Sequence, residues 1–201
     1  MLVDTDVFCK LGVAGFLEDA ARIFGADLQE CGRLPALPHM LRRGGLRELY
    51  GAPACETLIP VADPMPVVPQ PSVTWLDKLT PIDAIDPGEA RIFAAAAESG
   101  LIVVSGDKRA LRALKNVEGF ADALVGRIVV LEAVLLALCD RLGNEKVRRH
   151  IAPLASSDKM IEVCFSRANP DPPEALLSYY RNLAEEVAPL VLWNPQIGGG
   201  T

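Results

Sequence analysis

"LIVVSGDKRAL" (residues 101–111) runs from four aliphatic residues into a loop that carries one acid and two cations. A short apolar run bounded by Gly100 and Gly106 is typical of a strand that is buried on both faces of a parallel sheet. The next stretch, "KRALRALKN", has the apolar spacing of a helix. We therefore expect Asp107 to lie at the carboxyl end of a buried strand, just before a helix.

The same alternation of strand and helix occurs elsewhere in the chain. "MLV" precedes a helical pattern that continues to Gly25. "DPGEARIFAAAAESG" (86–100) has the signals of a complete helix, and "GRIVVL" (126–131) resembles a second buried strand that leads into the helical "EAVLLALCDRLG" (132–143). Strands that alternate with helices indicate parallel pairing. We predict an α/β fold in which helices flank a parallel central sheet.

Two further regions shape the expected domain organisation. Between residues 53 and 75 prolines remove backbone donors, which predicts a long connection, either a surface loop or a lid, rather than a continuous helix. Beyond about residue 145 every pattern is helical. We predict a main domain over 1–145 with a proline-rich insertion at about 53–75, followed by a helical C-terminal extension over 146–201.

Composition limits the classes of function. Net charge of −6 disfavours binding of nucleic acid over the whole surface, so any contact with a polyanion must be local. Five widely spaced cysteines form no C-x-x-C pair, which predicts reduced thiols. His39 and His150 are far apart, which disfavours a zinc site.

The chain has no feature that predicts a membrane protein or a secreted one. Its longest apolar stretch is interrupted by Glu132 and is too short to span a bilayer. The N-terminal "MLVDTD" has no basic region followed by a long apolar segment. We expect no membrane association and a cytoplasmic location.

Two acids follow the expected strands directly. Asp4 comes after "LV" and Asp107 after "LIVVSG", and ligands of open parallel sheets bind beyond the carboxyl ends of the strands. Glu89 lies in the first turn of the helix that leads into the second of these strands. Clustered carboxylates repel one another unless a cation neutralises them, and oxygen ligands suit Mg²⁺ or Mn²⁺. The expected chemistry is hydrolysis of a phosphate ester.

"MLVDTDVF", "GEARIFAAAAESG" and "LIVVSGDKRAL" resemble, in this order, the acidic motifs of the PIN-domain ribonuclease family over roughly residues 1–135. The resemblance implies that Asp4, Glu89 and Asp107 are catalytic and bind Mg²⁺ or Mn²⁺, with Ser105 as a supporting residue. It also implies a metal-dependent endoribonuclease that acts on single-stranded or structured RNA. Many members are toxins paired with an antitoxin, or dimers, so an antitoxin-like partner and a homodimer are open alternatives.

The sequence departs from the family pattern at two places. Asp6 stands where asparagine is commoner, and it could add a metal ligand or only a polar contact. We favour polar support over direct ligation for both Asp6 and Asp86. The family usually has another acid in the second helical segment, where Glu48 of "PHMLRRGGLREL" is the only candidate. Loss of that acid would weaken metal binding.

Basic residues at helical spacing follow Asp107 and predict a track for RNA phosphates. A helix face that is simply exposed to solvent explains the same pattern equally well. The same two explanations apply to the basic residues within 36–50. The candidate RNA-binding residues are Lys108, Arg109, Arg112 and Lys115 on the first helix and Arg42, Arg43 and Arg47 on the second.

Other interpretations of the acids stay open. Asp4 and Asp107 could simply cap the helices that follow them, and Glu89 fits a capping box with Asp86. The chain could then be a non-catalytic PIN-like module that binds RNA or docks a protein. A third hypothesis takes Asp4 and Asp6 as the D-x-D motif of haloacid-dehalogenase-like phosphatases, although "SGDKRAL" lacks the second acid of that class.

Overall fold

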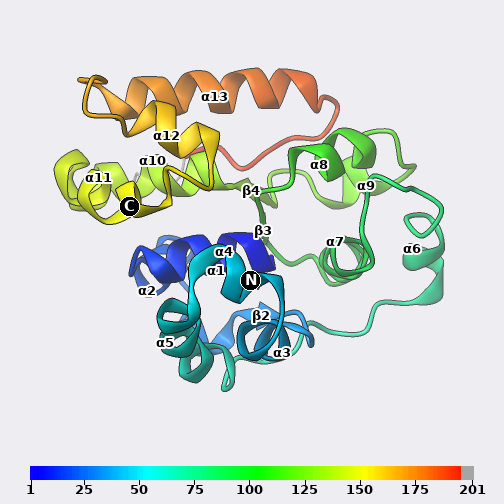
Figure 1. The fold of residues 1–201 in the computed structure, drawn as a ribbon. Coiled ribbons are helices and arrows are strands. Elements are labelled where there is room, and N and C mark those ends of the chain that lie inside the picture. Colours follow the sequence, from blue (N-terminus) through cyan, green and yellow to red (C-terminus); the bar gives the residue numbers. More distant parts are fainter. Residues whose placement is uncertain (196–201) are drawn as a thin grey trace.

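A four-stranded, all-parallel sheet organises the computed structural model, which describes residues 1–195 (Figure 1). The strand order is β2-β1-β3-β4, with helices on either side, so the predicted α/β class is confirmed. The strands are β1 (Leu2–Val3), β2 (Gly32–Arg33), β3 (Val103–Ser105) and β4 (Ile128–Val130).

Helices make up most of the remaining chain. The N-terminal half contains α1 (Thr5–Val13), α2 (Leu17–Ile23), the 3-10 helix η1 (Leu28–Glu30), α3 (Leu37–Arg42), α4 (Gly45–Tyr50), α5 (Ala52–Ala62), α6 (Val73–Asp77) and α7 (Pro87–Ser99). The C-terminal half contains α8 (Lys108–Leu114), α9 (Phe120–Ala123), α10 (Leu131–Leu142), α11 (Asn144–Ile151), the 3-10 helix η2 (Ala152–Leu154), α12 (Lys159–Cys164) and α13 (Pro172–Glu186). No helix within residues 1–195 is long and apolar enough to cross a membrane.

The strand order reverses beside β1. β1 pairs with β2 on one edge and with β3 on the other, and the backbone N–H of Asp4 donates to the carbonyl of Val104 over 3.0 Å. The reversal creates a topological switch point, the usual location of ligand sites in open α/β sheets. The carboxyl ends of β1 and β3 therefore meet where a ligand site is expected.

One hydrophobic core joins the sheet to the C-terminal helices. α7 packs against β1 and β3, and its small side chains Ala94 and Ala96 are fully buried. α13 lies along α10, and the chain then returns to the sheet, where Leu192 bridges Ile128 in parallel (Figure 1). The segment predicted as a C-terminal extension thus shares the core of the 1–145 region.

Two local expectations were wrong. The pattern up to Gly25 is two helices, because the chain turns between α1 and α2 at Gly15, where φ is +73°. Part of the proline-rich stretch is helical, since Pro53 lies in the first turn of α5, where no backbone donor is needed, and Pro60 lies near its end. Only residues 63–72 form the expected connection.

Candidate functional site

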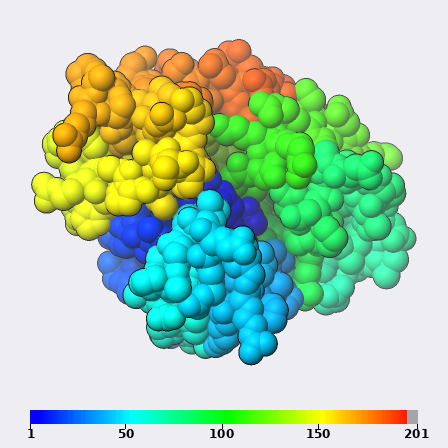
Figure 2. Space-filling view, in the orientation of Figure 1, coloured from blue at the N-terminus to red at the C-terminus, as the bar shows by residue number. Residues whose placement is uncertain are grey.

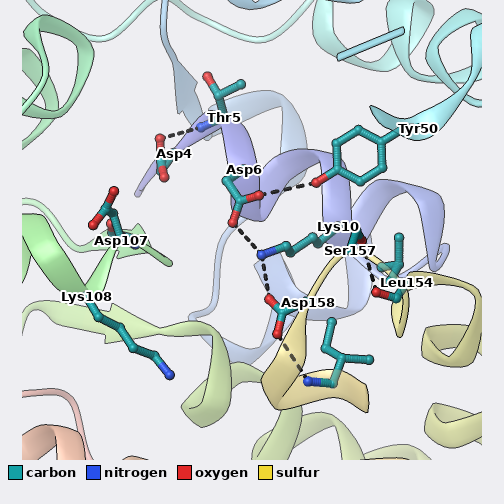
Figure 3. Close-up of polar contacts among 12 residues, drawn as sticks. Asp4, Thr5, Asp6, Lys10, Tyr50, Asp107, Lys108, Leu154, Ser157 and Asp158 are labelled. Carbon is teal, nitrogen blue, oxygen red and sulfur yellow. Dashed lines mark hydrogen bonds and ion pairs between the residues drawn. The ribbon is translucent and has the colours of Figure 1, made fainter. Parts of the chain in front are cut away.

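Asp4 and Asp107 lie beside each other at the switch point (Figure 3). Asp4 begins α1 and accepts a hydrogen bond from the backbone N–H of Thr5 over 2.7 Å. Asp107 begins α8 and accepts from the N–H groups of Arg109 and Ala110 over 2.7 and 2.9 Å. Both acids are therefore helix caps, as one interpretation predicted, yet their carboxylates also meet at one edge of the sheet.

Glu89 also combines a capping role with a place in this cluster. Asp86 accepts a hydrogen bond from the N–H of Glu89, and Glu89 accepts one from the N–H of Asp86, each over 2.8 Å. The carboxyl group of Glu89 also lies near enough to that of Asp107 for the two to interact electrostatically, and the residue is only 6% exposed. We call Asp4, Asp6, Asp86, Glu89 and Asp107 together the acidic edge.

The electrostatics of the acidic edge favour protons on two of its members. Burial, with the negative charge of Asp6 next in importance, raises the pKa of Asp4 from 3.8 to about 7. Burial also raises the pKa of Glu89 to about 8, and Asp107 and Asp86 add to the rise. Burial is the larger cause of both shifts, and the neighbouring acids add to it.

The loop between β3 and α8 is packed tightly around Asp6. Ser105 is buried, and its hydroxyl accepts a long hydrogen bond of 3.4 Å from the N–H of Asp107. A Cβ at Gly106 would lie 3.0 Å from Oδ2 of Asp6, so a larger residue there would push against that carboxylate. Gly106 was not among the predicted site residues, although "SGD" contained it.

A buried lysine, Lys10, which was not among the predicted site residues, holds Asp6. The ammonium group of Lys10 lies 2.7 Å from Oδ2 of Asp6 and 2.6 Å from Oδ2 of Asp158, and the hydroxyl of Tyr50 donates to Oδ1 of Asp6 over 3.2 Å (Figure 3). Both oxygens of Asp6 are thus engaged. This arrangement favours a supporting role for Asp6 over a metal ligand, and it disfavours proton transfer by Asp6 as the phosphatase hypothesis requires.

Glu48, the candidate for a fourth acid, does not reach the acidic edge. Glu48 is exposed on α4, whereas Tyr50 at the end of the same helix reaches the acidic edge. The spacing of "RELY" gave no indication of which of the two side chains points inward.

Most of the predicted RNA-binding cations are paired with acids. Lys108 lies 2.6 Å from Glu132, which is 1% exposed, and it also lies over the ring of Tyr179. Arg109 is different, since 67% of its side chain is exposed and its nearest acid, Asp107, is 3.8 Å away. Two further pairs join Arg42 to Asp63 over 2.6 Å and Arg112 to Glu186 over 2.7 Å.

The site lies in a hollow of the surface. Figure 2 shows a recess on this face, with N-terminal residues in blue at its base. Around the recess lie α4 and α5 in cyan, α8 in green and the segment around α12 in yellow. Three separate parts of the chain therefore form the walls around the acidic edge.

A metal site is not preformed in the described residues. No group of three histidine, cysteine or acidic side chains within 1–195 is arranged so that it could hold a metal ion as it stands. Asp107 caps α8 through Oδ1 and Glu89 caps α7 through Oε2, so each cap uses one of the two carboxylate oxygens.

Comparison with known proteins identifies no relative. No family model matches the chain, and no curated protein or solved structure matches it either. The likeness to PIN-domain ribonucleases therefore stays a prediction from three short motifs.

Proposed function

We propose that this protein is a metal-dependent, PIN-like endoribonuclease that hydrolyses RNA phosphodiester bonds in the cytoplasm. The observation that carries the proposal is the meeting of Asp4, Glu89 and Asp107 beside the switch point of a parallel sheet. The five cysteines, all free and buried, suit a reducing compartment.

The chemistry of the acidic edge fits a hard divalent cation. Asp4 and Glu89 have raised pKa values because they are buried among other acids. The nearest lysines cannot neutralise them, since Lys10 is held by Asp6 and Asp158 and Lys108 by Glu132. Mg²⁺ or Mn²⁺ held by Asp4, Glu89 and Asp107 would polarise the scissile phosphate and make water a better nucleophile.

Other side chains would orient the RNA and keep the acids in place. Arg109 extends from the first turn of α8 next to Asp107, where its exposed guanidinium can bind a backbone phosphate. Lys10 and Tyr50 hold Asp6 at the edge of the cluster. RNA contact is then local, as the net charge of −6 requires.

Calorimetric titration with Mn²⁺ tests the proposal. We expect saturable binding by the wild-type protein and none by Asp107→Asn, because that change removes a charged ligand while asparagine keeps the cap of α8. Asp140→Asn makes the same chemical change on the exposed end of α10 and should bind Mn²⁺ like the wild type. The wild type and Asp140→Asn should also cleave labelled single-stranded RNA, and Asp107→Asn should not.

A non-catalytic PIN-like module that binds RNA or docks a protein is the second candidate. It is favoured by Tyr50 in place of a fourth acid and by the ion pairs of Arg42, Arg112 and Lys108. A wild-type protein that shows no saturable Mn²⁺ binding and cleaves no RNA would overturn the nuclease proposal and favour this alternative. An antitoxin-like partner and a homodimer stay predictions from the resemblance.

A further inference from the structure

One acid of the C-terminal helices reaches the N-terminal site. Asp158 begins α12, where it accepts a hydrogen bond from the backbone N–H of Ile161 over 3.1 Å. Its other carboxylate oxygen binds the ammonium group of Lys10 over 2.6 Å. Only 15% of the Asp158 side chain and 11% of the Lys10 side chain are exposed, so this ion pair is poorly screened by solvent.

We infer that Asp158 is a positioning residue for the acidic edge, because it fixes Lys10 and Lys10 in turn fixes Asp6. The inference deepens the proposed function and rests on it only where metal binding is concerned. It makes the C-terminal helices part of the site rather than an appendage.

The geometry explains why Asp158 is needed. A lysine side chain has four rotatable bonds, and a single partner leaves its ammonium group much freedom. Asp158 and Asp6 approach the ammonium of Lys10 from two different elements, α12 and α1, so the lysine has one favourable position (Figure 3). Asp6 is then held through Oδ2 by Lys10 and through Oδ1 by Tyr50.

The β3–α8 loop, which ends at Asp107, lies against Asp6. Gly106 packs so closely against Oδ2 of Asp6 that a Cβ there would lie only 3.0 Å away. A shift of Asp6 therefore changes the space available to the residue before Asp107. The chain of contacts runs from Asp158 through Lys10 and Asp6 to this loop.

The charge balance argues for positioning rather than for contact with RNA. Asp6, Lys10 and Asp158 together carry two negative charges and one positive charge. A phosphate would be repelled by this group, and Lys10 is too buried to leave it. Lys10 is therefore a structural cation of the site.

Asp158→Asn and a matched control, Glu162→Gln, test the inference. Asparagine still caps α12 but cannot hold an ammonium group as a carboxylate does. Glu162 lies on the same helix, where it pairs with Lys159 over 2.8 Å and is 53% exposed, so the control removes the same charge. The measurements are the carboxyl ¹³C signals of Asp6 and Asp107 in the metal-free protein, and Mn²⁺ affinity by calorimetry.

We expect Asp158→Asn to shift both carboxyl signals and to weaken Mn²⁺ binding by about tenfold, the scale of loss found when a supporting residue of a metal ligand is removed. Glu162→Gln should change neither. In a Lys10→Met background, Asp158→Asn should have no further effect on the signals. Should Asp158→Asn fail to fold, Asp158→Ser keeps a capping hydroxyl and should shift the same two signals.

The inference is overturned if both signals stay where they are in the folded variant, or if Glu162→Gln moves them equally. A third outcome separates the two proposals. If Asp158→Asn moves both signals but neither the wild type nor any variant binds Mn²⁺, the positioning role stands and the proposed function fails.

Discussion

Asp4→Asn is expected to lower Mn²⁺-dependent RNA cleavage by roughly 100-fold or more and also to raise the melting temperature of the metal-free protein at pH 8. The loss of cleavage follows from removal of a proposed direct ligand, since changes to supporting residues alone cost roughly 10–100-fold. The gain in stability follows from the environment of Asp4, which is 9% exposed and surrounded by Asp6, Asp86 and Asp107. One substitution should therefore move activity and stability in opposite directions, as is common at functional sites.

The sign of the stability change depends on pH. Asp4 has a pKa of about 7 in the folded protein against an ordinary value of 3.8. Between these two values the unfolded chain is ionised while the folded protein keeps the proton, so the free energy of unfolding falls as pH rises. Above about pH 7 the loss is complete. Asparagine does not ionise, so the advantage of Asp4→Asn should grow from pH 4 to pH 7 and then stay constant.

Thermal unfolding without metal at pH 4 and pH 8 measures this difference. One pKa unit corresponds to about 1.4 kcal/mol, and we expect a gain of about 1–3 kcal/mol at pH 8. For a chain of this size 1 kcal/mol corresponds to roughly 2–4 °C. Mn²⁺ should stabilise the wild type and not the variant, because a ligand stabilises only the state that binds it.

Asp140→Asn is the control for this experiment, because Asp140 is exposed near the end of α10 and should show no such pH dependence. The prediction fails if Asp4→Asn melts below the wild type at pH 8, or if the difference in melting temperature is the same at both pH values. Either result would show that ionised Asp4 does not destabilise the folded protein.

Local signals in the sequence predicted the centre of the fold and much of the candidate site. The aliphatic run before Asp107 is β3, and Asp86, Pro87 and Gly100 bound α7 as the capping pattern indicated. These features depend on residues that are adjacent or one turn apart, so a short window contains the information. Because parallel strands align their carboxyl ends, the meeting of Asp4 with Asp107 was predictable as well.

Features that depend on distant contacts were not predictable in this way. β2 consists of Gly32 and Arg33, which have no apolar pattern, and it is a strand only because β1 and residue 67 pair with it. The pair of Lys10 and Asp158 spans 148 residues. Only the spacing of four between Asp6 and Lys10 was visible in the sequence, and it signals an ion pair without showing that the pair is buried.

The environment of Glu132 was only partly predictable from the sequence. An acid inside the apolar run "RIVVLEAVLLALC" predicted a helix that does not cross a membrane, but it did not identify the partner that makes its burial tolerable. In the structure Glu132 pairs over 2.6 Å with Lys108, which lies on α8 and was predicted to bind RNA. A buried charge in such a run indicates a partner, and for Glu132 that partner comes from another element, α8.

Lys10→Met is expected to destabilise the protein by about 3–5 kcal/mol, the usual cost of removing one partner from a buried ion pair. Methionine keeps the volume of the side chain but leaves Asp158, whose side chain is 15% exposed, and Asp6 without their shared cation. Urea unfolding at pH 7 measures the loss. Lys159→Met is the matched control, because Lys159 makes an exposed ion pair with Glu162 and its loss should not be measurable.

Acid should reduce the difference between Lys10→Met and the wild type. Burial alone would raise the pKa of Asp158, but the hydrogen bond and charge of Lys10 outweigh it and hold the pKa below its ordinary value of 3.8. Such a group stabilises the folded protein at pH values above the pKa that it has in the unfolded chain. This stabilisation is lost as the pH falls through the pKa that the group has in the folded protein. The two proteins should therefore differ most near neutral pH and converge below about pH 3.8. A difference that is independent of pH would mean that Lys10 contributes by packing its aliphatic stem and not by its charge.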